Sequence, residues 1–444
     1  MKILTAVCIL NLGVSFAATS VTQHGITWSF DADYSTGQYA NGDYYVVENS
    51  PGAGVKVTDI TRTNSAIGHD GSMVDPVPDL TNHGYDDRVP GYSAALNASE
   101  SLPNLVVSAG SSLVSTISRD ITNAGARPVL DVAAILTVVS LAPPANSFRP
   151  SYAGPSKVTG LTTSDVDSSL LLSLSPVASA PSIATAEALV EKPWIDHRLE
   201  WQGDYLHPEQ NMVNYGAGMA RDAHDVALRL LLNDSFSAKE TLLYRFIQLG
   251  IDNYGLVLNG AYWGNVGGTI GVGRKLPILF AGLLLNHANM KNVATDYDTQ
   301  EVFQEDGQTF YLTQAERDAT YDPANCAAGV DYCNEGWYDS MALGTARWGA
   351  RHYLWETTSY PYLPGKTNYR GLTHESTLGA ALVVKLLEIE SLWNHDPFLN
   401  WQETMVKENV TGTWESIFAQ DMWDSYYNYS NLKLVKSNGR FAIP

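Results

Sequence analysis

Charge is scarce in this sequence, and positive charge is the scarcer kind. Charged residues make up 17% of the 444 residues, with 27 Lys and Arg against 47 Asp and Glu, so the formal net charge is -20. This is the wrong sign for neutralising phosphates, which excludes nucleic acid as a partner. Hydrophobic residues make up 45%, enough to bury large cores, and this excludes wholesale disorder. The length predicts two or three domains.

Long apolar runs are absent beyond the N-terminus, and even residues 276–285 are too short to span a bilayer. The first residues are Met1 and Lys2, followed by an apolar run that closes with small residues at Ala17. This pattern is typical of a secretory signal. We therefore expect residues 1–17 to be removed, the mature chain to start at Ala18 and to be extracellular or periplasmic, and no membrane partner to remain afterwards.

Cysteine is nearly absent, with three in the chain. Cys8 lies in the predicted signal, which leaves Cys326 and Cys333. In an oxidising compartment their spacing suits a local disulfide, and a metal site is less favoured because no histidine lies nearby. The glycosylation sequons would be acceptors in a eukaryotic host; they are at Asn97, Asn233, Asn409 and Asn428.

Common signatures of metal, nucleotide and serine-hydrolase sites are also missing. The sequence has no His-Glu-x-x-His motif, no helix-loop-helix calcium loop and no Gly-x-Ser-x-Gly elbow. Asp31, Asp33 and Asp43 are candidates for calcium binding, but a solvated turn is the favoured interpretation. We therefore predict no metal and no cofactor.

Composition changes near residue 190, because ten of the 11 tryptophans lie from Trp194 onward. The preceding part carries short β-branched and aromatic segments separated by turn residues, which predicts a β-sandwich over residues 18–150. A Pro- and Ser-rich connector over residues 151–193 is expected to run across the surface. The predicted strands are 25–30, 43–47, 55–60, 105–107, 112–117 and 132–141.

From Trp194 the hydrophobic period becomes helical. Helical hairpins packed side by side predict an (α/α) toroid, or an incomplete one, over residues 194–444. The fold class is therefore α+β and multidomain. The predicted helices are 217–232, 238–254, 275–290, 337–354, 375–393, 398–407 and 414–427.

Four polar, aromatic loops precede these helices and are the candidate functional segments. The first, residues 200–215, holds Trp201, His207, Asn211 and Tyr215 and leads into a helix with Arg221. Its side chains either act on a ligand or tie down a long loop, with Arg221 pairing with Asp225 one turn on. The second, residues 259–275, is rich in glycine, contains Trp263 and ends in Arg274 and Lys275. It suits an anion such as a uronate carboxylate, or is a flexible surface loop.

The third loop holds Trp337 and Tyr338 and continues to Arg351. Aromatic faces stack on sugar rings, so these residues suit a carbohydrate groove, although at least half of the later tryptophans are expected in the core. The fourth loop, residues 369–376, holds His374, which is either a site residue or a satisfied histidine at a helix end.

Together these features resemble the (α/α)-toroid polysaccharide lyases, although many of those enzymes place their β-domains after the toroid. The resemblance implies that Asn211 neutralises a uronate carboxylate, that Tyr215 acts as base and acid with His207 as a second base, and that Arg274 clamps the carboxylate. The implied partner is a polysaccharide. The implied substrate contacts are Trp201, Trp263, Lys275, Trp337, Tyr338, Arg351 and His374.

Two other functions stay open. A glycoside hydrolase on the same scaffold would use a carboxylate pair drawn from Glu209, Asp222, Glu335 and Asp339. A secreted carbohydrate-binding or surface structural protein would need no catalysis. The polar loops before separate helices favour an enzyme, while the net charge opposes a polyanionic substrate unless salt screens it. The sugar, linkage, host and oligomeric state stay open.

Overall fold

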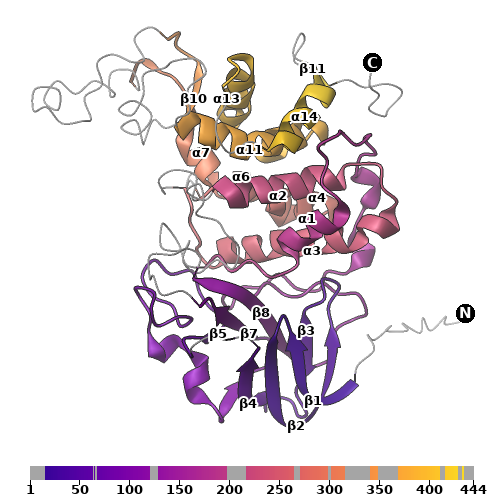
Figure 1. Ribbon diagram of the computed structural model, residues 1–444, viewed down its shortest axis with the longest axis vertical. Coiled ribbons are helices and arrows are strands. Elements are labelled where there is room, and N and C mark those ends of the chain that lie inside the picture. Colours follow the sequence, from indigo (N-terminus) through magenta and orange to yellow (C-terminus); the bar gives the residue numbers. More distant parts are fainter. Residues whose placement is uncertain are drawn as a thin grey trace, which may run out of the picture.

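The computed structural model describes residues 16–63, 65, 68–120, 129–197, 217–264, 271–298, 302–315, 341–348, 369–410, 416–428 and 433–434. Strands occupy the first part of the chain and helices the later part, and the helices are stacked beyond the sheet (Figure 1). The predicted mixture of a sheet-rich N-terminal region and a helical C-terminal region is therefore confirmed.

The N-terminal strands form one eight-stranded sheet in the order β5-β7-β8-β3-β2-β4-β6, with β1 paired to β2. The pairs are antiparallel except β3 with β8, which is parallel. The strands are β1 Phe16–Gln23, β2 Ile26–Gln38, β3 Tyr44–Val47, β4 Val55–Arg62, β5 Ser72–Val74, β6 Leu105–Val107, β7 Ser112–Ser118 and β8 Leu130–Val139.

The sequence predicted two packed sheets here, whereas the described strands form a single barrel-like sheet. The long strand β2 explains the difference. Its first half pairs with β4 and its second half with β3, and the register shifts between Ser29 and Phe30. A strand that changes partners at a bulge bends the sheet, so that the sheet curls around one interior instead of splitting into two layers.

Arg62 ties the far edges of this curled sheet together. From the end of β4, its Nε donates to the Thr116 carbonyl of β7 at 2.7 Å, and Nη2 donates to the Gly71 carbonyl at 3.1 Å. Inside the curl, the Trp28 indole donates to Ser115 Oγ at 2.9 Å. One half-buried guanidinium thus adds hydrogen bonds between the end of β4 and two backbone carbonyls, that of Thr116 in β7 and that of Gly71 just before β5.

β8 is buried on both of its faces. Val132 and Leu136 belong to the core inside the curled sheet, while Leu130 and Ile135 belong to the core shared with the helices. A strand covered on both sides reads as a continuous apolar run, as residues 132–136 do. The sheet and the helices therefore share a continuous core.

The connector contributes to that core, contrary to the expectation that it runs over the surface. Tyr152 and Leu174 are buried, and Leu174 forms a bridge with Leu232 at the end of the α2 segment. A Pro- and Ser-rich composition indicates irregular backbone but does not prevent single apolar side chains from packing inward. Its short helices are η3 Thr163–Asp165, η4 Ser168–Leu170 and α1 Ile183–Val190.

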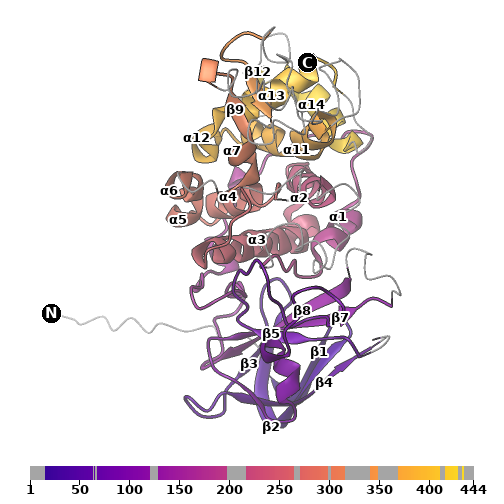
Figure 2. The same cartoon turned by 90° about the vertical axis from the view of Figure 1, so that its left-hand side faces the viewer.

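The later helices lie in layers on the sheet (Figure 2): α3 with α1 first, then α2 and α4, then α11, α13 and α14. Helices α2 and α3 occupy the segments predicted as the first helical hairpin. None of the described helices has both the length and the apolar character needed to cross a membrane. The bounds are α2 Ala217–Leu230, α3 Phe236–Leu258, α4 Lys275–Leu284, α5 Ala288–Lys291, α6 Val293–Asp296, α7 Gln304–Gln308, α11 Tyr369–Leu386, α12 Glu390–Trp393, α13 Asp396–Lys407 and α14 Ile417–Tyr426.

Part of the predicted helix 337–354 is a strand instead. β10 (Ala346–Trp348) pairs antiparallel with β9 (Thr309–Tyr311), and all three residues of β10 are buried. Arg347 and Trp348 gain a partner strand that the local helical period cannot reveal, because it lies far away in the sequence. A second short pair is formed by β11 (Tyr427–Asn428) and β12 (Lys433–Leu434).

Gly250 sets the close approach of α3 to α4. A Cβ at this position would lie 2.2 Å from the Pro277 carbonyl oxygen and 2.6 Å from Ala281 Cβ. We expect Gly250→Ala to lower the free energy of unfolding by about 1–3 kcal/mol, even though alanine favours a helix by about 1 kcal/mol over glycine. Urea unfolding measures the change, and Ala281→Gly in the same chain should recover part of it. Equal or greater stability of Gly250→Ala would contradict this packing.

The predicted glycan acceptors differ in exposure. Asn97 is buried, and its side-chain oxygen accepts hydrogen bonds from the backbone of Ser72 and Ser99, each at 3.0 Å. Asn233 and Asn409 are exposed. Asn428 is described only as part of β11. A folded chain therefore offers Asn233 and Asn409 to a glycan, and not Asn97.

Candidate functional site

Arg274 lies at the end of the Gly-rich loop, where α4 begins, and it is buried. Its Nε and Nη2 bind the carboxylate of Asp196 at 2.6 and 3.2 Å, and Nη1 donates to the Val272 carbonyl at 2.7 Å. The charge predicted to clamp a substrate carboxylate is therefore balanced by a carboxylate of the chain itself.

Lys275 and Trp263 also lie inside the molecule. Lys275 Nζ binds Asp306 at 2.6 Å and lies 4.4 Å from the centre of a Trp393 ring. Trp263 is buried and stacks on Phe303 at 6.3 Å between ring centres. In this structure both side chains anchor the two ends of the Gly-rich loop.

The start of α2 is the place where the loop ends meet. Arg274 Nη2 lies 3.5 Å from Met219 Sδ. Gly273 has φ +92° and comes so close to α2 that a Cβ would lie 2.7 Å from Ala220 Cα. Only glycine fits a backbone of this conformation against another helix. The Gly-rich loop and the helix that follows the first polar loop are therefore in direct contact.

Residues 369–376, predicted as the fourth loop, are instead the first two turns of α11, and this helix contacts α2 one turn later. His224 Nδ1 lies 2.8 Å from the Ser376 carbonyl of α11, so Nδ1 carries the proton, and Ser416 Oγ donates to Asp225 at 2.5 Å. Ser416 caps α14 by accepting from Ala419 N at 2.9 Å. We call this set the α2 site; it comprises Met219, His224 and Asp225 with their partners Arg274, Ser376 and Ser416.

Trp401 of α13 contacts both Trp348 of β10 and His374 of α11. The Trp348 ring lies 5.1 Å from the Trp401 ring, and the His374 ring meets Trp401 edge-on at 6.1 Å. His374 Nδ1 bonds Gln402 Oε1 at 2.6 Å. His374 is buried and satisfied, so it supports the wall of a pocket and does not project into solvent.

A pocket opens beside the α2 site, between α11, α13 and α14. It encloses about 670 Å³, including the part open to solvent. Glu375 and Asp424 are the acidic residues that line the pocket. Asp225 does not line it but accepts a hydrogen bond from Ser416, which does. The lining residues are His374, Glu375, Leu378, Val406, Asn409, Val410, Ser416, Gln420 and Asp424.

Burial controls protonation at the α2 site. It raises the pKa of Asp225 to about 7, and the nearby charge of Asp222 acts in the same direction although Ser416 opposes it. Burial also raises the pKa of Asp222, against the pull of Arg221, and lowers the pKa of His224 to about 4. At neutral pH the site thus offers a carboxyl group that can hold a proton and a neutral imidazole.

Several of the predicted residues are not described by the structure: Trp201, His207, Asn211, Tyr215, Trp337, Tyr338, Arg351, Cys326 and Cys333, with the carboxylates Glu209, Glu335 and Asp339. The ends of segment 198–216 are nevertheless placed. Asp196 on one side and Met219 on the other both contact Arg274. Described residues on both sides of the segment that carries four predicted site residues therefore contact Arg274.

Sequence reasoning missed Asp196, Glu305 and the role of Asp225. Asp225 was assigned to Arg221, but Arg221 instead binds its neighbour Asp222 at 3.1 Å. Glu305 accepts from the Gly273 backbone at 2.8 Å. A buried acid in an otherwise polar segment gives no periodic signal, and its partner is visible only after folding.

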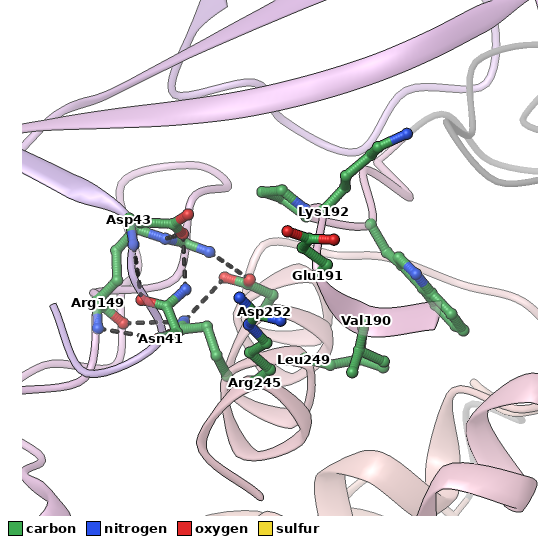
Figure 3. Close-up of a pocket in the computed structure, with 12 residues that line it drawn as sticks. Asn41, Asp43, Arg149, Val190, Glu191, Lys192, Arg245, Leu249 and Asp252 are labelled. Atoms are coloured by element: carbon green, nitrogen blue, oxygen red, sulfur yellow. Dashed lines mark hydrogen bonds and ion pairs between the residues drawn. The ribbon is translucent and has the colours of Figure 1, made fainter. Parts of the chain in front are cut away.

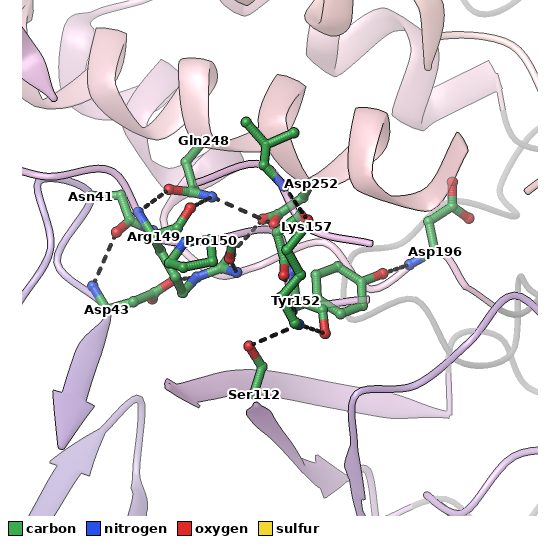
Figure 4. A network of polar contacts seen from close by, with 12 residues as sticks. Asn41, Asp43, Ser112, Arg149, Pro150, Tyr152, Lys157, Asp196, Gln248 and Asp252 are labelled. Atoms are coloured by element: carbon green, nitrogen blue, oxygen red, sulfur yellow. Dashed lines mark hydrogen bonds and ion pairs between the residues drawn. The ribbon is translucent and has the colours of Figure 1, made fainter. Parts of the chain in front are cut away.

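A second polar site lies where the sheet meets the helices (Figure 4). Arg149 is fully buried between Asp43, bound through Nε at 2.6 Å, and Asp252 of α3, bound through Nη2 at 2.5 Å. Gln248 binds the Arg149 backbone at both its nitrogen and its oxygen. Asp43 is therefore neither a calcium ligand nor a solvated turn residue here, but part of a buried ion-pair triad.

Among the residues that the structure describes, three side chains could offer metal ligands together: His69, Asp86 and Asp87. His69 is already bonded to Asp87, and Arg88 binds Asp86 at 2.7 Å. A metal ion here would have to displace histidine from one carboxylate and lie beside a guanidinium.

Comparison with known proteins leaves this geometry as the only guide to function. No family model, curated protein or solved structure matches the chain.

Proposed function

We propose that this chain is a secreted enzyme that degrades a uronate-containing glycan by β-elimination at the α2 site. The observation that carries the proposal is that the end of the Gly-rich loop and helix α11 both meet α2 there. Met219 contacts Arg274 at the end of the second loop, and His224 contacts Ser376 in the second turn of α11. A purely structural protein does not need its titratable loops gathered at one helix.

The reaction would be carried by residues on segment 198–216. Asn211 would neutralise the uronate carboxylate and so lower the pKa of the C5 proton; Tyr215 or His207 would remove this proton, and Tyr215 would protonate the leaving oxygen as the C4–O bond breaks. Arg274 is held by Asp196, so we assign it the positioning of this segment rather than direct contact with the carboxylate.

The finer architecture belongs to the same proposal. In an (α/α) toroid, helix starts on one side surround the substrate groove. The start of α2 lies against the start of α4 through Gly273 and Ala220, and its next turn lies against α11 through His224 and Ser376. This arrangement supports an incomplete toroid.

Hydrolysis is the second candidate because of Asp225. Its pKa of about 7 would let it donate a proton to the glycosidic oxygen near neutral pH, while a carboxylate such as Asp222 or Glu375 activates water or attacks the sugar. The lining of the pocket next to this site includes Glu375 and Asp424, which suits a neutral or cationic sugar better than a uronate.

The test is digestion of a panel of uronate and neutral polysaccharides. Elimination generates the ultraviolet absorbance of an unsaturated uronate, and Tyr215→Phe should then lose about a hundredfold or more in rate, as expected for a general base. Tyr44→Phe in the sheet is the matched control and should keep full activity.

Reducing ends without ultraviolet absorbance, lost on Asp225→Asn, would replace elimination by hydrolysis. Full activity of Tyr215→Phe would remove the assignment of the base. Binding of glycans with no new chain ends across the panel would replace both enzymatic proposals by the carbohydrate-binding one.

A further inference from the structure

A pocket lies between the curled sheet and the first helical layer, next to the buried triad (Figure 3). It encloses about 340 Å³, including the part open to solvent. The turn before β3 contributes Asn41, the chain after α1 contributes Glu191 and Lys192, and α3 contributes Arg245. Three segments distant in the sequence thus build one polar pocket.

Most charges in this pocket already have partners. Asp43 and Asp252 both bind Arg149, and Lys192 Nζ donates to the Asp131 carbonyl at 3.2 Å. Arg245 differs from these groups. Its Nε is buried and has no hydrogen-bond partner in the protein. In Figure 3 its side chain lies among the residues that line the pocket.

An unsatisfied buried N–H is rare, because the lost hydrogen bond to water is not replaced. Such a group donates its hydrogen bond to something outside the chain, either a water molecule or a ligand. A guanidinium prefers a planar anion that accepts two parallel hydrogen bonds, and a carboxylate has this shape. Of the three acids in the pocket wall, Asp43 and Asp252 bind Arg149, and Glu191 forms no ion pair with Arg245, so no side chain of the wall neutralises the charge of Arg245 by direct contact.

We propose that this pocket binds the carboxylate group of a small organic acid through Arg245. The carboxylate enters beside Arg245, and the rest of the ligand lies toward solvent. The site is separate from the α2 site and does not depend on glycan cleavage, so either proposal can fail without the other.

The experiment uses the full chain and two probes, sodium acetate and sodium glucuronate, with glucose as the neutral counterpart. Saturation-transfer NMR at constant ionic strength measures binding. We expect both carboxylates to bind and glucose not to bind. Arg245→Gln should weaken carboxylate binding about tenfold or more, because a charge-assisted pair is lost. Arg88→Gln, which removes an arginine of the sheet-rich region that is paired with Asp86, should bind like the unmodified chain.

Three outcomes would overturn the proposal: no binding of either carboxylate, unchanged binding by Arg245→Gln, or equal weakening by Arg88→Gln. Circular dichroism of each variant without ligand checks the fold. If Arg245→Gln does not fold, Arg245→Lys keeps the charge but loses the paired geometry, and it should still bind more weakly than arginine; equal binding would likewise refute the carboxylate geometry.

Discussion

Replacing Arg149 by methionine should lower the free energy of unfolding by about 3–5 kcal/mol, the usual range for removing one partner of a buried ion pair. Burial alone would lower the pKa of Arg149, but Asp252 and Asp43 outweigh burial and raise that pKa above its ordinary value. Without the guanidinium, two buried carboxylates would face each other unpaired. Urea unfolding followed by circular dichroism measures the change.

The carboxylates provide the control for this prediction. Asp43→Asn and Asp252→Asn, added to Arg149→Met, remove the uncompensated charges and should recover a large part of the loss. Lys407→Met, an exposed substitution at the end of α13, should change stability by less than about 0.5 kcal/mol. A loss below about 1 kcal/mol for Arg149→Met would show that the triad does not join sheet and helices in solution.

Glu305→Gln should stabilise the protein at pH 8 by up to about 3 kcal/mol. Burial raises the pKa of Glu305 from 4.5 to about 7, although the Gly273 backbone N–H opposes the shift. The folded state therefore prefers the protonated acid. The stabilising contribution of protonated Glu305 is complete below pH 4.5 and is lost as the pH rises through 7. Glutamine does not show this loss, because it stays neutral at every pH and keeps an oxygen that accepts from the Gly273 backbone.

The measurement is the free energy of unfolding of both chains from pH 4.5 to 8. The curves should meet at the acid end and separate toward pH 8. Asp59→Asn, at an exposed carboxylate of β4, is the control and should follow the unmodified chain. Parallel curves for Glu305→Gln would mean that Glu305 is not buried as a neutral acid.

The order of strands and helices could be predicted because it depends on local pattern. β7 and α3 coincide closely with apolar segments of the expected period. The curl of the sheet could not be predicted, because it depends on the bulge at Ser29 in β2 and on Arg62, whose partner in β7 lies far away in the sequence. β10 was missed for the same reason: its strand partner is non-local.

The positions of two candidate segments could be predicted from the sequence, but the pairing of their charged side chains could not. The segments 200–215 and 259–275 were identified from their polar and glycine-rich composition, and Met219, in the helix that follows the first segment, contacts Arg274 near the end of the second. What the sequence could not reveal is that Arg274 and Lys275 are already paired with Asp196 and Asp306. Formal charge can be counted in a sequence, whereas its neutralisation is decided by distances between side chains.

The double burial of β8 has a consequence for how the chain is made. Synthesis proceeds from the N-terminus, so β8 is complete at Val139 long before α3 begins at Phe236. During that interval the side of β8 that carries Leu130 and Ile135 has no helices to cover it. A nascent chain of this protein therefore exposes an apolar strip on its sheet until the later segments have been translated.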